Sequence, residues 1–179
     1  MAEIHIFSGL LSSIVPQFRR GTEELTKRVN EIDDGVEAKH RNWIFWRIVA
    51  WRLIAKHRNA RLIGPIILGG HSNGVLAARK VAKVLSKHGI NVDYEFSIDP
   101  TIFPFPKVDH NVNRHDEVHA TSGICAIFRY ITFKRSGSIF FVDNWNGNGF
   151  YMSRKGGHVA IASYDNVHSR ILDQVRQVL

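Results

Sequence analysis

Residues 66–78 contain the pattern that most narrows the folds open to this chain. An apolar run leads into Gly70-His71-Ser72-Asn73-Gly74, and helix-forming residues follow without a break. A strand that turns at once into a helix holds its central residue above the edge of the sheet. Glycine on either side leaves room where a Cβ would collide with the strand or the helix. We therefore predict that Ser72 is a nucleophile on a strand-to-helix turn; a helix-capping serine is the simpler alternative.

Strand-like and helix-like segments alternate along the rest of the chain. Strands are expected at residues 3–7, 35–38, 64–69, 91–98 and 138–142, and helices at residues 21–32, 43–57, 75–88 and 166–178. This alternation predicts an α/β fold with a mostly parallel sheet of about five to six strands and helices on both faces. Thr22 is expected to cap the first helix.

The length and composition favour one domain covering residues 1–179, because 179 residues with 44% hydrophobic side chains suffice for one core. Residues 101–130 interrupt the alternation, since they are Pro-rich at first and polar afterwards. We expect them to form a lid-like or substrate-binding insertion over the carboxyl edge of the sheet.

A nucleophilic serine needs a base to take its proton and a carboxylate to orient that base. Asp99 and Asp143 each follow an expected strand, and carboxylates at the carboxyl ends of parallel strands point into the crevice where ligands bind. His158 follows two glycines in an expected loop and has the placement that a base requires. His168 falls inside the last expected helix, where we interpret it as an exposed surface histidine.

The pentapeptide around Ser72, in its strand-to-helix setting, resembles the nucleophile elbow of the α/β-hydrolase family. The resemblance extends to the first loop, the acid strand and the terminal histidine, and it does not cover residues 101–130. It implies a catalytic triad of Ser72, Asp99 and His158. Asp99 is preferred to the alternative acid Asp143, because its strand-Asp-Pro ending resembles that of small lipase-like members.

The same resemblance implies an oxyanion hole made of two backbone N–H groups. One belongs to Asn73, directly after the nucleophile. The other comes from the loop after the first strand, at Leu10 or at its neighbour Gly9, although Ser8 replaces the histidine often found before that glycine. His71 is expected to pack beneath the turn.

The function implied is a serine esterase or lipase-like hydrolase that cleaves a carboxylic ester or thioester through an acyl-enzyme on Ser72. The short chain is similar in size to cutinase- or thioesterase-like members of the family. The resemblance implies a small-molecule or lipid acyl ester as the substrate and no cofactor. Two alternatives stay open: acyl transfer to an acceptor other than water, and a non-catalytic protein that binds an anionic partner through its basic surface.

The formal net charge of +8 favours contact with something anionic. Residues 39–53 mix aromatic and cationic side chains, and as an amphipathic helix they could lie on an anionic membrane surface. We prefer a helix that faces the core and has a basic outer side. The side chains that suit this interpretation are Trp43, Ile44, Arg47, Ile48, Trp51 and Leu53. Nucleic acid binding would rest on net charge alone, and we do not expect it.

The remaining motifs are weaker. Cys125 is the single cysteine, which permits no internal disulfide and fits a reducing compartment. With no signal-like start and no long apolar run, a cytoplasmic location is expected. On a helix, His115 and His119 would lie on the same face and could bind zinc there. The sequence context does not identify a third ligand for such a site. A solvated loop is the preferred interpretation, and no metal is expected.

Overall fold

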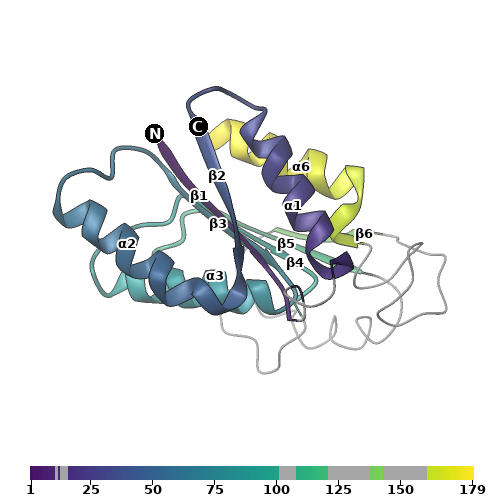
Figure 1. Ribbon diagram of the computed structural model, residues 1–179, viewed down its shortest axis with the longest axis horizontal. Coiled ribbons are helices and arrows are strands. Elements are labelled where there is room, and N and C mark those ends of the chain that lie inside the picture. The colour runs from purple at the N-terminus through teal and green to yellow at the C-terminus, as the bar shows by residue number, and fades with distance from the viewer. Residues whose placement is uncertain (11, 13–15, 101–107, 121–137, 143–160) are drawn as a thin grey trace.

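The structure is a computed structural model that describes residues 1–10, 12, 16–100, 108–120, 138–142 and 161–179 (Figure 1). Six strands form one parallel sheet in the order β2-β1-β3-β4-β5-β6. The strands are β1 (Ala2–Ser8), β2 (Val36–Asn42), β3 (Ile66–His71), β4 (Tyr94–Ile98), β5 (His115–Ala120) and β6 (Ser138–Val142). The helices are α1 (Gln17–Asn30), the short η1 (Trp43–Phe45), α2 (Trp46–Arg58), α3 (Asn73–Ser86), the short η2 (Ile161–Ser163) and α6 (Asp165–Val178).

Helices cover both faces of the sheet, as the alternating pattern predicted (Figure 1). Helices α1 and α6 pack on one face, where Leu25 and Ile171 join a buried cluster with Ile67 of β3. Helices α2 and α3 pack on the other face, where Leu53 joins a second cluster with Leu68. Neighbouring residues of β3 therefore point into different cores, which is why an unbroken apolar run forms this strand.

Strand β5 lies within the segment that was expected to be an insertion. It pairs with β4 on one side and with β6 on the other, so residues 115–120 belong to the sheet. Residues 101–107 and 121–130 lie outside the described residues. Because the segment is a strand, positions four residues apart are separated by about 13 Å. The helical zinc site considered for His115 and His119 is therefore wrong. The preferred solvated loop is wrong as well, because His115, Asp116 and Glu117 are buried in the strand.

Two expectations about helices α1 and α2 also differ from the structure. Thr22 lies inside α1, where its Oγ1 donates to the backbone oxygen of Arg19 at 2.8 Å, so it is no N-cap. Helix α2 buries Val49, Ala50, Leu53 and Ile54. The sequence analysis expected Ile44, Ile48 and Trp51 to suit a helix that faces the core. This was wrong for these three residues, because all of them are exposed. Within the described part of the chain, no helix has both the length and the apolar character needed to cross a membrane.

Candidate active site

Ser72 occupies the turn between β3 and α3 in a conformation that few non-glycine residues adopt. Its φ is 57° and its ψ is −125°. Its N–H donates to the backbone oxygen of Ile98 at 2.9 Å, and its own backbone oxygen accepts from the N–H of Val75 at 3.0 Å. These two bonds hold a backbone conformation that costs about 1–3 kcal/mol for a residue with a Cβ. Such strain at the end of a strand is typical of a functional residue.

Two glycines make the turn sterically allowed. A Cβ on Gly70 would lie 2.3 Å from the backbone carbon of Gly74, and a Cβ on Gly74 would lie 2.1 Å from the backbone oxygen of Phe7. Neither contact involves a flexible side chain, so backbone would have to move. The Gly-x-Ser-x-Gly pattern is therefore required by the packing of α3 against the ends of β3 and β1.

The loop after β1 passes directly beside the Ser72 side chain. A Cβ on Gly9 would lie 2.9 Å from the Cβ of Ser72 and 3.2 Å from its Oγ. The structure thus brings together Ser72, Asn73 at the start of α3, and the loop that contains Leu10, whose side chain is 49% exposed. The two N–H groups proposed for the oxyanion hole belong to segments that flank the Ser72 side chain.

A chain of hydroxyl contacts fixes this loop, and the sequence analysis missed it. Asn42 Nδ2 donates to Ser12 Oγ at 3.3 Å, Ser12 Oγ lies 2.8 Å from Ser8 Oγ, and Ser8 Oγ donates to the backbone oxygen of Arg41 at 3.2 Å. Ser8 and Ser12 are both buried. These side-chain hydrogen bonds connect the loop beside Ser72 to the end of β2. Small polar residues at two neighbouring strand ends were the only signal for it.

Asp99 lies beside Ser72 at the same edge of the sheet. The register pairs His71 with Ile98, so the next residue of each strand end is Ser72 on β3 and Asp99 on β4. Asp99 is buried, its φ is 43°, and its N–H donates to the backbone oxygen of Val118 at 2.7 Å. The structure therefore places Ser72 and the proposed acid Asp99 at neighbouring strand ends.

The structure describes two of the three histidines considered for the site, His71 and His168, but not the proposed base. His158 and the alternative acid Asp143 lie outside the described residues. His168 is buried rather than exposed, which corrects the earlier interpretation. Its Nε2 lies 2.7 Å from the backbone oxygen of Ala162 and its Nδ1 lies 3.1 Å from Arg28 Nη1. Burial lowers the pKa of His168, so this imidazole is a neutral structural group. His71 is buried at the end of β3, as expected.

Helix α3 is anchored by a buried ion-pair network. Arg79 Nε donates to Glu95 Oε1 at 3.1 Å, and its Nη2 donates to Glu117 Oε2 at 3.0 Å and to Ser97 Oγ at 3.1 Å. These side chains are all buried. The network joins α3 to β4 and β5, and so it fixes the helix whose first residue is Asn73. Sequence reasoning missed it because arginine and glutamate are ordinarily surface residues.

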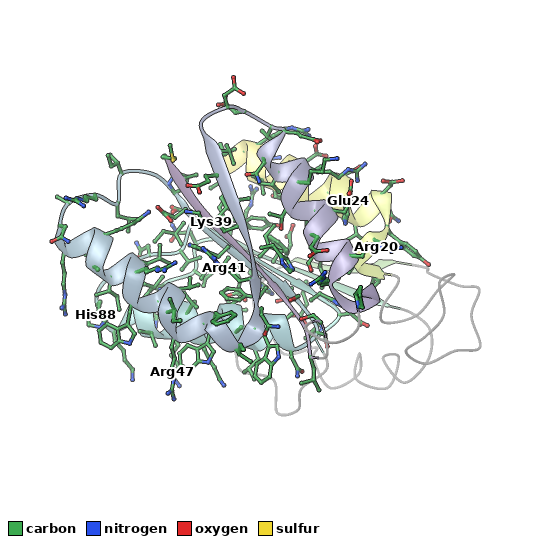
Figure 2. All side chains as sticks on the ribbon, viewed as in Figure 1. Arg20, Glu24, Lys39, Arg41, Arg47 and His88 are labelled. Atoms are coloured by element: carbon green, nitrogen blue, oxygen red, sulfur yellow. The ribbon has the colours of Figure 1, made fainter. Side chains whose placement is uncertain are left out.

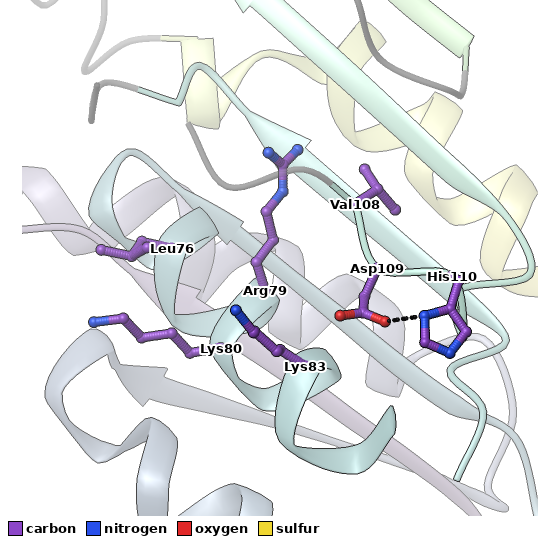
Figure 3. A pocket seen from close by; sticks show the side chains of 7 residues that line it. All are labelled: Leu76, Arg79, Lys80, Lys83, Val108, Asp109 and His110. Carbon is purple, nitrogen blue, oxygen red and sulfur yellow. Dashed lines mark ion pairs between the residues drawn. The ribbon is translucent and has the colours of Figure 1, made fainter. Parts of the chain in front are cut away.

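An open pocket of about 450 Å³ lies beside α3, and Ser72 is not among the residues that line it (Figure 3). Its lining consists of Leu76, Arg79, Lys80, Lys83, Val108, Asp109 and His110. Asp109 and His110 form an ion pair at 2.9 Å. Within the described ranges, no group of three or more His, Cys, Asp or Glu side chains is placed to hold a metal ion.

No protein-family model and no curated protein sequence matches this chain. Solved structures do match it. A Xanthomonas campestris pv. campestris protein, described as a hydrolase of the alpha/beta superfamily, is 21% identical with a TM-score of 0.62, and the match covers 99% of each chain. The RedJ thioesterase from the prodiginine biosynthetic pathway in Streptomyces coelicolor is 14% identical with a TM-score of 0.54, over 99% of this chain and 85% of that one.

An esterase from Pyrobaculum calidifontis is 10% identical with a TM-score of 0.57, over 99% of this chain and 77% of that one. At these identities the likeness is one of fold. The chain has the α/β-hydrolase fold that its sequence predicted.

Proposed function

We propose that this chain is a serine hydrolase that cleaves a carboxylic ester or thioester through an acyl-enzyme on Ser72. The observation that carries the proposal is the strained backbone of Ser72, at φ 57° and ψ −125°, between a strand end and a helix start. Esterases and thioesterases with the same fold support it. The structural role of a helix cap accounts less well for the turn, since the Ser72 side chain makes no capping hydrogen bond.

The proposed chemistry assigns one task to each group. His158 takes the proton from Ser72 Oγ as the oxygen attacks the acyl carbon, and Asp99 orients the imidazole and stabilises its charged form. The N–H groups of Asn73 and Leu10 donate to the oxyanion. His158 then protonates the leaving group, and a water molecule activated in the same way releases the acid. This chemistry requires no cofactor.

The test is the intact mass of the protein after treatment with a fluorophosphonate, followed by peptide mapping. One adduct on Ser72 is expected in the wild type, and none in Ser72→Ala or His158→Ala. Ser86→Ala, a serine at the far end of α3, serves as the matched control and is expected to label fully. A folded wild type that forms no adduct would contradict the proposal and favour the non-catalytic alternative.

The identity of the acid is tested in the same assay. Asp99→Asn is expected to slow labelling by about 10⁴-fold if it acts as the triad acid, because the histidine then adopts the wrong tautomer. Asp143→Asn is expected to label at the wild-type rate. The reverse result would transfer the role to Asp143. Once Ser72 is labelled, hydrolysis and acyl transfer are distinguished by whether added alcohols or thiols capture the acyl group instead of water.

A further inference from the structure

The net positive charge of this chain comes from one continuous stretch of the sequence. Residues 38–92 contain eleven of the 24 Lys and Arg residues and none of the 16 Asp and Glu residues. The remainder of the chain, with 13 basic and 16 acidic side chains, has a net charge of −3. The excess of positive charge is therefore carried by the segment that runs from β2 through α2 to the end of α3.

An apolar ridge stands on the outer side of this segment. Its members are Ile44 (54% exposed), Phe45 (45%), Ile48 (47%) and Trp51 (59%), from η1 and α2. Ile44, Ile48 and Trp51 follow one another at four and three residues, the spacing of a single helix face. The opposite side of α2 already buries its own apolar residues against the core, so the ridge is additional to what the fold requires.

Cations flank the ridge on both sides. At 100° per residue, Arg47 and Arg58 lie along one side of the ridge and Arg52 lies along the other, and all three are exposed. Helices α2 and α3 lie next to each other (Figure 1). Figure 2 shows Arg47 and His88, the residue that follows α3 by two positions, on the same side of the molecule.

Helix α3 extends the basic surface. The Lys80 ammonium and the Arg47 guanidinium each lie 5.3 Å from the centre of the Trp46 ring, and the rings of Trp51 and His88 are 6.3 Å apart. Lys83 and Lys87 are exposed further along α3. We call the surface made by η1, α2 and α3 the α2–α3 face.

We propose that the α2–α3 face binds the surface of an anionic phospholipid bilayer. In this arrangement Ile48 and Trp51 enter the boundary between headgroups and acyl chains, and the flanking arginines and lysines contact lipid phosphates. An apolar ridge flanked by cations is the pattern of helices that lie in a membrane interface. Each exposed cation near such a surface strengthens binding, and the apolar ridge supplies a contribution that salt does not screen.

Other occupants fit the face less well. A nucleic acid would pair with the cations but offers no partner for aliphatic side chains such as Ile44 and Ile48. A second copy of the chain would bring two surfaces of the same charge together, because residues 38–92 contain no acidic residue. The bilayer satisfies both the apolar ridge and the cations.

The test is flotation of the full chain with vesicles of phosphatidylcholine alone or with about 30% phosphatidylglycerol. Binding to the anionic vesicles is expected at about 0.1 M salt, with a large loss at about 1 M, where the Debye length falls from about 10 Å to 3 Å. The Ser72→Ala protein is expected to bind equally well, so the outcome does not depend on the proposed hydrolase activity.

Matched variants separate the face from overall charge. Arg47→Gln with Arg52→Gln is expected to weaken binding about 25-fold, at about fivefold for each cation. Arg20→Gln with Lys27→Gln removes the same charge from exposed positions of α1 and is expected to leave binding nearly unchanged. Equal losses in the two pairs would overturn the proposal, since net charge alone would then explain the binding.

The ridge is tested separately. Ile48→Ser with Trp51→Ser is expected to weaken binding at least tenfold, and this loss is expected to persist at low salt. Ile63→Ser, at a position that is 84% exposed, is the control and is expected to bind normally. Wild-type binding by the ridge variant would overturn the proposal, because charge alone would then hold the protein on the vesicles. Equal binding to neutral and anionic vesicles would overturn it as well.

Discussion

The strain at Ser72 can be measured by comparing two substitutions that both remove the hydroxyl. Ser72→Ala keeps a Cβ in the conformation at φ 57° and ψ −125°, and Ser72→Gly removes it. Holding a residue with a Cβ in such a conformation costs about 1–3 kcal/mol. Glycine avoids this cost because it reaches positive φ without a steric clash. The glycine variant is therefore expected to be the more stable of the two.

The expected difference follows from two opposing terms. Relief of the strain favours Ser72→Gly by about 1–3 kcal/mol, and the larger conformational freedom of glycine in the unfolded chain opposes it by about 0.4–1 kcal/mol. The net expectation is a free energy of unfolding about 0–2.6 kcal/mol higher for Ser72→Gly than for Ser72→Ala, with a midpoint of about 1.3 kcal/mol. For a chain of 179 residues this midpoint corresponds to about 3–5 °C in Tm.

The assay is urea unfolding followed by tryptophan fluorescence, with the Tm as a second measure. Gly89→Ala provides a calibration, because Gly89 has a φ of +67° and nothing within 4 Å of an added Cβ, so its cost is conformational alone. A glycine variant at position 72 that is less stable than the alanine variant would refute the reasoning. It would mean that the turn is not strained and that the argument from backbone to nucleophile fails.

Three further predictions concern other buried charges and histidines. His158→Ala is expected to abolish labelling by a fluorophosphonate without lowering Tm. His168→Gln is expected to lower Tm while the folded protein still labels. Scanning fluorimetry measures the Tm and intact mass measures the labelling. Arg79→Leu leaves two buried carboxylates uncompensated and should cost about 3–5 kcal/mol in urea unfolding, with partial recovery in Arg79→Lys; an unchanged midpoint would contradict the network. A hydrogen bond from a neighbouring histidine and an ion pair with a lysine lower the pKa of Glu3 to about 2. Its contribution to stability is thus present above about pH 4.5 and is lost as the pH falls toward 2, and Glu3→Gln should show a smaller loss between pH 5 and pH 2 in urea unfolding.

Local signals were sufficient to predict five of the six strands and the strand-to-helix turn at Ser72. The apolar run before Gly70 can only be a strand buried on both faces, and the two glycines of the turn are fixed by contacts with backbone a few residues away or at the end of β1. Asp99 was predicted by its position after an apolar strand, and the register of β3 and β4 places it beside Ser72. The position of Asp99 at a strand end needed only the period of the pattern and the direction of parallel strands, whereas its preference over Asp143 as the acid rested on the resemblance to lipase-like hydrolases.

Strand β5 could not be predicted, because its sequence is polar while its position is buried. Glu117 is held by Arg79 from α3, and Asp116 accepts from the Tyr94 hydroxyl at 3.3 Å on β4. Each of these partners lies more than twenty residues away in the sequence. A polar segment is interpreted as solvated unless its partners are known, and tertiary pairing supplies them here. The same reason explains why buried His168 was expected on the surface.

The outer side of α2 illustrates the opposite error. Aromatic and aliphatic residues at helical spacing predict a buried face, and Leu53 does point into the core. The helix carries more apolar residues than one face of the sheet can cover, so Ile48 and Trp51 remain exposed. Periodicity shows that a helix has an apolar side, but it does not show how wide the covered part is.

Backbone strain gives an independent reason to associate Ser72 with Asp99. Among the described residues, three that are not glycine have a positive φ: Ala60, Ser72 and Asp99. Ala60 lies just beyond the end of α2, where a left-handed residue is a common way to end a helix. The other two lie on neighbouring strand ends, each with its N–H bonded to the next strand, at 2.9 Å to Ile98 and at 2.7 Å to Val118. The sheet thus stabilises two costly conformations side by side, and residues held in such conformations cluster at functional sites in proteins generally. This argument supports Asp99 as the partner of Ser72 without using any resemblance to other proteins.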